Sequence, residues 1–329
     1  MSDVSATSWT TFLLRLTRKI DRPIVIAFAC IVALLLVGGM FSRNFMSPEY
    51  ILLQLKVGAF LGIIATGLMM VILLGHIDLS LPWTITVGAM MACAAAGHGQ
   101  LGHILAIPVG IGCGVLIGIV NGILVALLRI PSMIATLATN AVAQGIMIVY
   151  TGGSSPQDSA PNVMRWLAAG WLVPGVPNAV ALWVLIGGAT MFLLSRTTFG
   201  RTLYAIGNTE RAAYLSGINT RLVTVAAFAV CSAFAAFGGV LLAGYASKAA
   251  QSMGDAYLLP AIAAVVLGGT SILGGRGSYL GTVAGAILIT LLQSILSVAQ
   301  MPEAGRQIIY GVVIAAMLLL YGRSSKREA

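Results

Sequence analysis

The chain has 329 residues, of which 59% are apolar and only 8% are Asp, Glu, Lys or Arg. A typical soluble domain carries about 25% charged residues, so this chain has too few charges to cover a water-facing surface. Composition therefore argues against a soluble enzyme, a disordered chain and a nucleic-acid-binding domain, and we expect no nucleic acid among its partners. The net charge of +9 comes from 18 basic and 9 acidic residues. Sparse basic residues in so apolar a chain indicate a membrane protein held in the lipid bilayer by cytoplasmic Lys and Arg.

Long uncharged runs predict an all-α polytopic membrane protein. A spanning helix needs about 20 apolar residues, and 50 consecutive residues between Asp78 and Arg129 carry no formal charge. The runs are continuous rather than alternating, which disfavours a β-barrel. We predict about ten spanning helices, at 24–42, 51–75, 82–97, 103–128, 132–151, 178–195, 222–246, 256–273, 279–298 and 306–322.

These helices would form a single transmembrane domain over residues 24–322. A cytoplasmic segment (1–23) precedes it and a cytoplasmic tail (323–329) follows it. The first apolar run could be mistaken for a cleaved signal peptide. Its polar lead is long and nine more spans follow, so we expect it to be retained.

The distribution of basic residues predicts that both termini are cytoplasmic. With ten spans, 13 basic residues lie inside and five outside. The inside set is Arg15, Arg18, Lys19, Arg22, Arg129, Arg196, Arg201, Arg211, Arg221, Arg276, Arg323, Lys326 and Arg327. The outside set is Arg43, Lys56, Arg165, Lys248 and Arg306.

Small residues indicate how the helices pack. Several glycines recur at intervals of four, a spacing that lets helix backbones approach closely in lipid. The four cysteines fall inside predicted spans without metal-ligand spacing, so we interpret them as small apolar packing residues. The glycine pairs are Gly58–Gly62, Gly110–Gly114, Gly114–Gly118, Gly118–Gly122 and Gly281–Gly285.

Residues 75–82 (GHIDLSLP) predict a break between two helices. The simplest interpretation is a helix restart, in which Asp78 or Ser80 caps the next helix and Pro82 lies in its first turn. A compatible interpretation is a broken helix beside a transport pathway, because irregular backbone at membrane depth is tolerated where it lines a cavity.

Other polar residues within the spans are pathway candidates. Thr136, Asn140 and Gln144 share one helix face at i, i+4 and i+8. Hydrogen bonding between helices explains such residues as well as pathway lining does. The full set of pathway or broken-helix candidates is Asp78, Ser80, Asn121, Thr136, Asn140 and Gln144.

A glycine-rich stretch at 268–278 predicts a tight cytoplasmic turn between two helices, with Arg276 as an inside anchor. Its glycines are Gly268, Gly269, Gly274 and Gly275. It lacks the Lys-Ser or Lys-Thr ending of a phosphate-binding P-loop, and no strand precedes it. VILLGHIDLS (71–80) is weakly similar to VVLGGTSILG (265–274), which suggests an internal repeat.

The most polar internal stretch is the loop at 196–221. Within it, residues 209–215 predict a short helix that Asn208 or Thr209 caps and Gly217 ends. Ala212, Ala213 and Leu215 would be exposed unless a partner covers them. The loop is either a solvated connection or a docking element for a cytoplasmic partner.

Three motifs in this chain resemble bacterial ABC-transporter permeases of the ribose, xylose and galactose type. FGRTLYAIGNTERAAYLSGI (199–218) resembles the family's cytoplasmic coupling loop. GHIDLS (75–80) resembles its Gly-x-Asp-Leu-Ser segment, and LPAIAAVVLGGTSILGGRGSYLGTVAGAI (259–287) resembles its C-terminal signature. The matches occur in family order and the resemblance covers nearly the whole chain.

The resemblance implies an inner-membrane permease that works as a homodimer, with two cytoplasmic ABC ATPase subunits and a periplasmic sugar-binding protein. This chain has no nucleotide motif, so we expect no cofactor on it and ATP hydrolysis on the partner. Few fixed charges lie in the spans, which indicates a small neutral solute. The residues that the resemblance and the loop chemistry assign to coupling are Arg201, Tyr204, Gly207, Asn208, Glu210, Arg211, Ala212, Ala213, Ser216 and Gly217.

Two other functions remain open at this point. An intramembrane enzyme would need convergent acid–base or metal ligands, and the three histidines lie in or near separate turns. A proton-coupled carrier would depend on Asp78 alone. Copurification with an ATPase would separate the permease from both.

Overall fold

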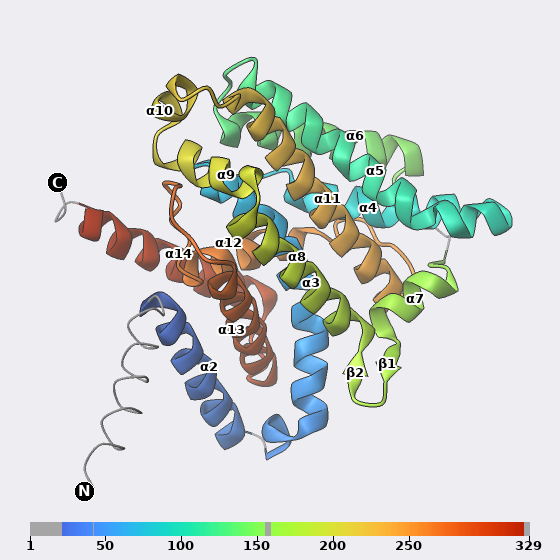
Figure 1. The fold of residues 1–329 in the computed structure, drawn as a ribbon. Coiled ribbons are helices and arrows are strands. Elements are labelled where there is room, and N and C mark those ends of the chain that lie inside the picture. Colours follow the sequence, from blue (N-terminus) through green and yellow to red (C-terminus); the bar gives the residue numbers. More distant parts are fainter. Residues whose placement is uncertain (1–21, 42, 155–158, 326–329) are drawn as a thin grey trace, which may run out of the picture.

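The computed structural model describes residues 22–41, 43–154 and 159–325. Most of the predicted cytoplasmic segment 1–23, and the end of the predicted tail 323–329, lie outside these residues. The described chain is an all-helical bundle with one short hairpin (Figure 1).

Each of the ten predicted spans contains a helix. These helices are α2 (Arg22–Phe41), α3 (Pro48–Leu73), α4 (Leu81–Ala96), α5 (Gly99–Ala126), α6 (Ser132–Thr151), α8 (Asn178–Arg196), α11 (Thr220–Ala246), α12 (Leu258–Leu267), α13 (Tyr279–Val298) and α14 (Glu303–Ser325). Between them lie η1 (Arg43–Met46), α7 (Asn162–Ala169), the antiparallel strands β1 (Trp171–Val173) and β2 (Val176–Pro177), α9 (Thr198–Asn208), α10 (Glu210–Leu215) and η2 (Asp255–Tyr257).

Within the described residues, six helices are long and apolar enough to cross a membrane: α3, α5, α6, α8, α11 and α13. Shorter apolar helices occupy Ile26–Met40, Leu81–Ala96 and Asp255–Leu267. The prediction of a helix over 256–273 was too long at its C-terminal end, because α12 stops at Leu267. Gly268 and Gly269 follow, and Gly269 has a φ of +88°, which a helix cannot contain.

Helix α3 forms the centre of the bundle. Every residue from Gly58 to Leu73 is buried, and α11, α13, α8 and α12 pack around it. Small residues on α3 allow this enclosure. Gly62, for example, lies under the indole ring of Trp183, so that any larger side chain there would collide with the ring.

The predicted glycine-mediated packing is confirmed between α5 and α11. A β-carbon at Gly114 would lie 2.7 Å from the carbonyl oxygen of Ser232, and one at Gly118 would lie 2.7 Å from the Cα of Ala229. One turn further, a β-carbon at Gly122 would lie 2.6 Å from the Cα of Val225. The two backbones therefore touch along three successive turns, which only glycine permits.

The weak internal similarity corresponds to two helices that end in the same way. At the end of α3 the N–H of His76 donates to the carbonyl of Val71 (3.1 Å), and Gly75 has a φ of +81°. At the end of α12 the N–H of Thr270 donates to the carbonyl of Val265 (3.2 Å), and Gly269 takes the matching left-handed conformation. Both are glycine-terminated C-caps.

The short elements that connect the long helices lie at two opposite ends of the bundle. Helices α9 and α10 lie at one end, and α7 with the β1–β2 hairpin lies at the other (Figure 1). Arg129 in the α5–α6 turn reaches α10, and the glycine-rich turn after α12 reaches the end of α9. The α5–α6 turn, the loop at 196–221 and the glycine-rich turn, all predicted to be cytoplasmic, therefore lie at one end.

Candidate functional site

The predicted break between helices is confirmed at residues 74–80. Helix α3 ends at Leu73 and α4 begins at Leu81, with Pro82 in its first turn. The predicted capping bond is absent, because Ser80 occupies the N-cap position without accepting a hydrogen bond from the helix. Asp78 instead closes a local turn: its Oδ1 accepts from the Ser80 N–H (2.9 Å) and from the Ser80 hydroxyl (2.6 Å).

This carboxyl group lies inside a buried polar network. Asp78 is only 1% exposed, and the thiol of Cys231 in α11 also bonds to it. The amide of Asn121 in α5 donates to the Ser80 hydroxyl at 2.7 Å, and the Thr139 hydroxyl donates to the Asn121 carbonyl oxygen. The network ties the break to α5, α6 and α11.

A stripe of polar side chains on α6 supports the same break. Three backbone N–H groups without helical partners donate to it: Ile77 to Ser132 (3.4 Å), Leu79 to Thr136 (2.9 Å) and Trp83 to Asn140 (3.3 Å). The first turn of a helix leaves N–H groups unpaired, and in a membrane protein these require partners from the protein. The stripe on α6 therefore supplies partners for two N–H groups of the break and, through Asn140, for one N–H in the first turn of α4.

Burial separates the six pathway candidates into four that are enclosed by the protein and two that are at least partly exposed. Asp78, Ser80, Asn121 and Thr136 are buried and hydrogen-bonded within the subunit. Asn140 is half-buried, and Gln144 is exposed. Sequence reasoning missed Ser132 and Thr139, although Ser132 extends the Thr136–Asn140 spacing by one turn. It also missed the polar role of Cys231, which we had interpreted as a packing residue.

The loop at 196–221 is largely helical. The short helix predicted at 209–215 is confirmed as α10 (Glu210–Leu215), and Gly217, with a φ of +83°, ends it. Neither Asn208 nor Thr209 makes the predicted side-chain cap. Sequence reasoning missed α9, whose buried residues Gly200, Leu203 and Ile206 recur with a period of about three.

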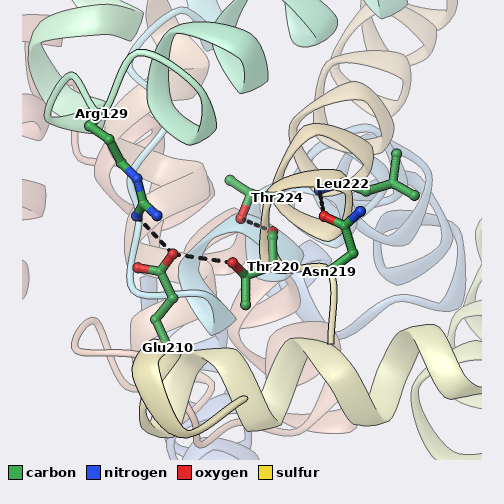
Figure 2. A network of polar contacts seen from close by, with 6 residues as sticks. All are labelled: Arg129, Glu210, Asn219, Thr220, Leu222 and Thr224. Carbon is green, nitrogen blue, oxygen red and sulfur yellow. Dashed lines mark hydrogen bonds and ion pairs between the residues drawn. The ribbon is translucent and has the colours of Figure 1, made fainter. Parts of the chain in front are cut away.

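Glu210 ties α10 to its neighbours (Figure 2). Its carboxylate accepts from the Arg129 guanidinium at 2.9 Å and from the Thr220 hydroxyl at 3.4 Å. Arg129 belongs to the α5–α6 turn and Thr220 begins α11. The pair is half-exposed, so it contributes at most about 1 kcal/mol to stability. Through it, α10 contacts the α5–α6 turn.

The exposed surface of α10 differs from the predicted one. Ala213 is buried at 4% exposure, because it faces the bundle between α9 and α11. Arg211, Ala212 and Ser216 are exposed, together with Tyr214 (66%) and Leu215 (77%). Arg201, earlier in α9, is exposed as well.

The glycine-rich turn contacts the end of α9. Tyr204 donates its hydroxyl proton to the carbonyl of Gly277 at 3.0 Å. Burial raises the pKa of the Tyr204 phenol above its usual value, so the group remains a donor at neutral pH. Gly268 and Gly269 end α12, whereas Gly274 and Gly275 lie against Gly207 and Asn208. Gly274 also lies against the main-chain nitrogen of Gly75, so three of the motifs singled out in the sequence meet in space.

The opposite end of the bundle contains a cavity of about 390 Å³ that sequence reasoning did not predict. His103 in α5 and Asn162 and Arg165 in α7 contribute its polar lining, and Arg165 donates to Asn162 at 2.8 Å. In the described part of the chain, no cluster of His, Cys, Asp and Glu could hold a metal ion.

Comparison with known proteins identifies the family. Residues 50–320 match the family model described as "Branched-chain amino acid transport system / permease component". The chain belongs to this family of permease components. It is therefore a transport subunit and a multi-pass protein of the inner membrane.

Its relatives include import permeases. The ribose import permease protein RbsC of Haemophilus influenzae is 32% identical over 89% of this chain and 91% of its own length. RbsC of Bacillus subtilis is 33% identical over 89% and 90%. The autoinducer 2 import system permease protein LsrC of Escherichia coli is 31% identical over 91% and 86%. No solved structure matches the chain.

Proposed function

We propose that this permease is the membrane-spanning subunit of an ATP-driven ABC importer for a small neutral sugar or sugar-like solute. The names of its relatives, which import ribose and autoinducer 2, support this substrate class. Its partners would be a second permease subunit in a homodimer, two cytoplasmic ABC ATPase subunits and a periplasmic sugar-binding protein. ATP would bind only to the ATPase, and this chain would carry no cofactor of its own.

The single observation that carries the coupling role is the exposed surface of α10. A six-residue helix that is anchored through Glu210 and Ala213 presents Tyr214 and Leu215 to solvent at one end of the bundle. Exposed apolar side chains on a fixed short helix suit insertion into a groove of another protein. Arg201, Arg211, Ala212 and Ser216 would surround this contact, with Gly217 ending the helix. Tyr204, Gly207 and Asn208 would support it from within the chain.

We propose a topology of ten crossings with both termini in the cytoplasm, all within a single transmembrane domain over residues 24–322. Helices α4 and α12 have 16 and 10 residues, which is short for a membrane about 30 Å thick. The irregular segments 74–80 and 268–278 would complete their crossings. Such backbone is tolerated at membrane depth where protein surrounds it.

We propose that the solute pathway lies beside the outward face of α6. That helix is mostly exposed along its length, and its exposed polar residue Gln144 lies one turn beyond Asn140. These two side chains could contact solute, whereas Asp78, Ser80, Asn121 and Thr136 would support the wall. The cavity bounded by His103 and Arg165 lies at the opposite end of the bundle from α10. The binding protein would dock at this cavity end.

Reconstitution tests this function. The chain, its co-encoded ATPase and its binding protein would be incorporated into proteoliposomes, and uptake of radiolabelled ribose and other monosaccharides would be measured. We expect uptake that requires ATP, and no uptake driven by a proton gradient alone. Proton-driven uptake without ATP would instead support the secondary carrier.

A matched pair of variants tests α10. Leu215→Arg should abolish copurification of the ATPase because it places a charge in the apolar contact. Leu101→Arg makes the same change at an exposed leucine (67%) at the other end of the bundle, and should leave copurification intact. Normal ATPase capture by Leu215→Arg would remove α10 from the interface. Ala213→Arg is unsuitable, because Ala213 is buried.

A further inference from the structure

Three segments that are far apart in the sequence meet at one backbone contact, which we call the glycine junction. It consists of Leu73–Gly75 at the end of α3, Tyr204–Asn208 at the end of α9, and Gly274–Gly277 in the turn before α13. The N–H of Gly275 donates to the carbonyl of Leu73 at 2.9 Å, and the Tyr204 hydroxyl donates to the carbonyl of Gly277 at 3.0 Å.

The glycines allow these backbones to touch. A β-carbon at Gly207 would collide with the carbonyl oxygen of Leu73 and the nitrogen of Gly275. One at Gly274 would lie 2.8 Å from the Gly75 nitrogen and 3.0 Å from the Gly207 carbonyl oxygen. The atoms in these contacts belong to the main chain and cannot move away by changing rotamer. The three segments are therefore constrained to move together.

Each partner of α9 in this junction leads directly to a helix boundary. Leu73 is the last residue of α3, and Gly75 lies in the break that contains Asp78 and precedes α4. Gly277 lies two residues before α13. A displacement of the end of α9 would thus reach the α3–α4 break through the main-chain contact between Gly207 and Leu73. It would reach the α12–α13 turn through the main-chain contact between Gly207 and Gly275 and through the Tyr204 hydroxyl bond to Gly277.

We propose that the glycine junction transmits movement of α9 and α10 to the two helix boundaries, so that ATP hydrolysis drives transport. This inference rests on the proposed function. Gly207 and Gly274 are then positioning residues: they act through backbone contact and touch neither the ATPase nor the solute. Allosteric coupling requires contacts that favour one of two states of the protein over the other. In the glycine junction, α9 contacts the two helix boundaries that we propose it moves.

The test uses Gly207→Ala in the full complex, reconstituted with ATPase and binding protein. Gly207 lies within α9, where alanine is the better helix former, so any loss must arise from the contact and not from helix propensity. We expect the variant to assemble and hydrolyse ATP while solute uptake per ATP falls about tenfold. Gly188→Ala is the matched control, since a β-carbon at this α8 glycine has no neighbour within 4 Å.

A normal ratio of solute to ATP in Gly207→Ala would overturn the proposal. If that variant fails to assemble, Tyr204→Phe decides, because it removes only the hydroxyl bond to Gly277. A lowered ratio in Tyr204→Phe supports the junction, and an unchanged ratio overturns it. Failure of the unmodified complex to couple ATP to uptake would instead remove the proposed function, so the two failures are distinguishable.

Discussion

Asn121, in the second half of α5, donates a hydrogen bond of 2.7 Å to the hydroxyl of Ser80, 41 residues earlier in the chain. The same side chain accepts from Thr139 in α6. Asn121 has no exposed surface, so water cannot replace either partner. One amide thus holds the start of α4 between two other helices.

Replacing Asn121 by Leu should lower the midpoint of thermal unfolding in detergent. The change removes the two hydrogen bonds of the bridge, each worth about 0.5–1.5 kcal/mol, while the Thr139 hydroxyl can still donate to the Ala135 carbonyl. Gln144→Leu is the control, because Gln144 is exposed and makes no such bridge. Equal melting of the two variants would contradict a structural role for Asn121.

Asp78→Ala should destabilise the protein more than Asp78→Asn. Asparagine keeps a side-chain oxygen that can accept from the Ser80 N–H and hydroxyl, whereas alanine leaves the buried Ser80 N–H without this acceptor, at a cost of about 1–3 kcal/mol. The comparison of unfolding temperatures in nanodiscs measures the difference. A proton-coupling role for Asp78 predicts the opposite for transport, with both variants equally inactive.

Thr136→Val should be more harmful than Thr136→Ser. Valine has nearly the same shape but cannot accept the hydrogen bond from the Leu79 N–H, and an orphaned backbone donor costs about 1–3 kcal/mol. Serine retains the acceptor. Hydrogen exchange at residues 77–83 provides a local measurement, and we expect faster exchange in Thr136→Val only.

Gly118→Val should prevent folding or strongly reduce the yield of monodisperse protein. The new side chain would push α5 away from the α11 backbone at Ala229, and overpacking of this kind costs about 1–3 kcal/mol or more. Gly112→Val places the same side chain six residues earlier in α5, where nothing lies within 4 Å. Size-exclusion profiles of the two variants would separate a contact effect from the intrinsic cost of valine in a helix.

The pair Arg129–Glu210 should contribute little to global stability. A double-mutant cycle with Arg129→Gln and Glu210→Gln should give a coupling energy below about 1 kcal/mol, and the coupling should fall in high salt. The unfolding temperatures of the four proteins, at low and high ionic strength, test this. A coupling that is large and independent of salt would show that the pair is effectively desolvated.

The positions of the helices could be predicted because hydropathy and charge determine where a chain enters lipid. Ten apolar runs gave ten helices, and Gly217 marked the end of α10. The break at 74–80 was also visible, since Gly75, Asp78 and Pro82 each disfavour continuous helix.

The partners of the polar residues were not predictable to the same degree. Ser80 looked like a cap, but the acceptor for the Trp83 N–H in the first turn of α4 is Asn140 of α6, 57 residues away. Ala213 looked exposed because its neighbours in sequence are exposed, yet α9 folds back against it. Helix α9 was missed because its short apolar stripe lies in a stretch that is otherwise polar. For Ser80 and Ala213 the decisive contact is tertiary and leaves no local signature.

The brevity of α12 has a consequence for how the protein is made. Ten residues of helix rise about 15 Å, half the hydrocarbon thickness of a bilayer. Such a segment cannot partition into lipid as an independent span during synthesis. It can be retained against α3, which is already in place, and α13 encloses it later, on emergence from the ribosome. The C-terminal part of this permease therefore depends on the N-terminal part for its insertion, and a chain interrupted before α13 would leave α12 without a stable position in the membrane.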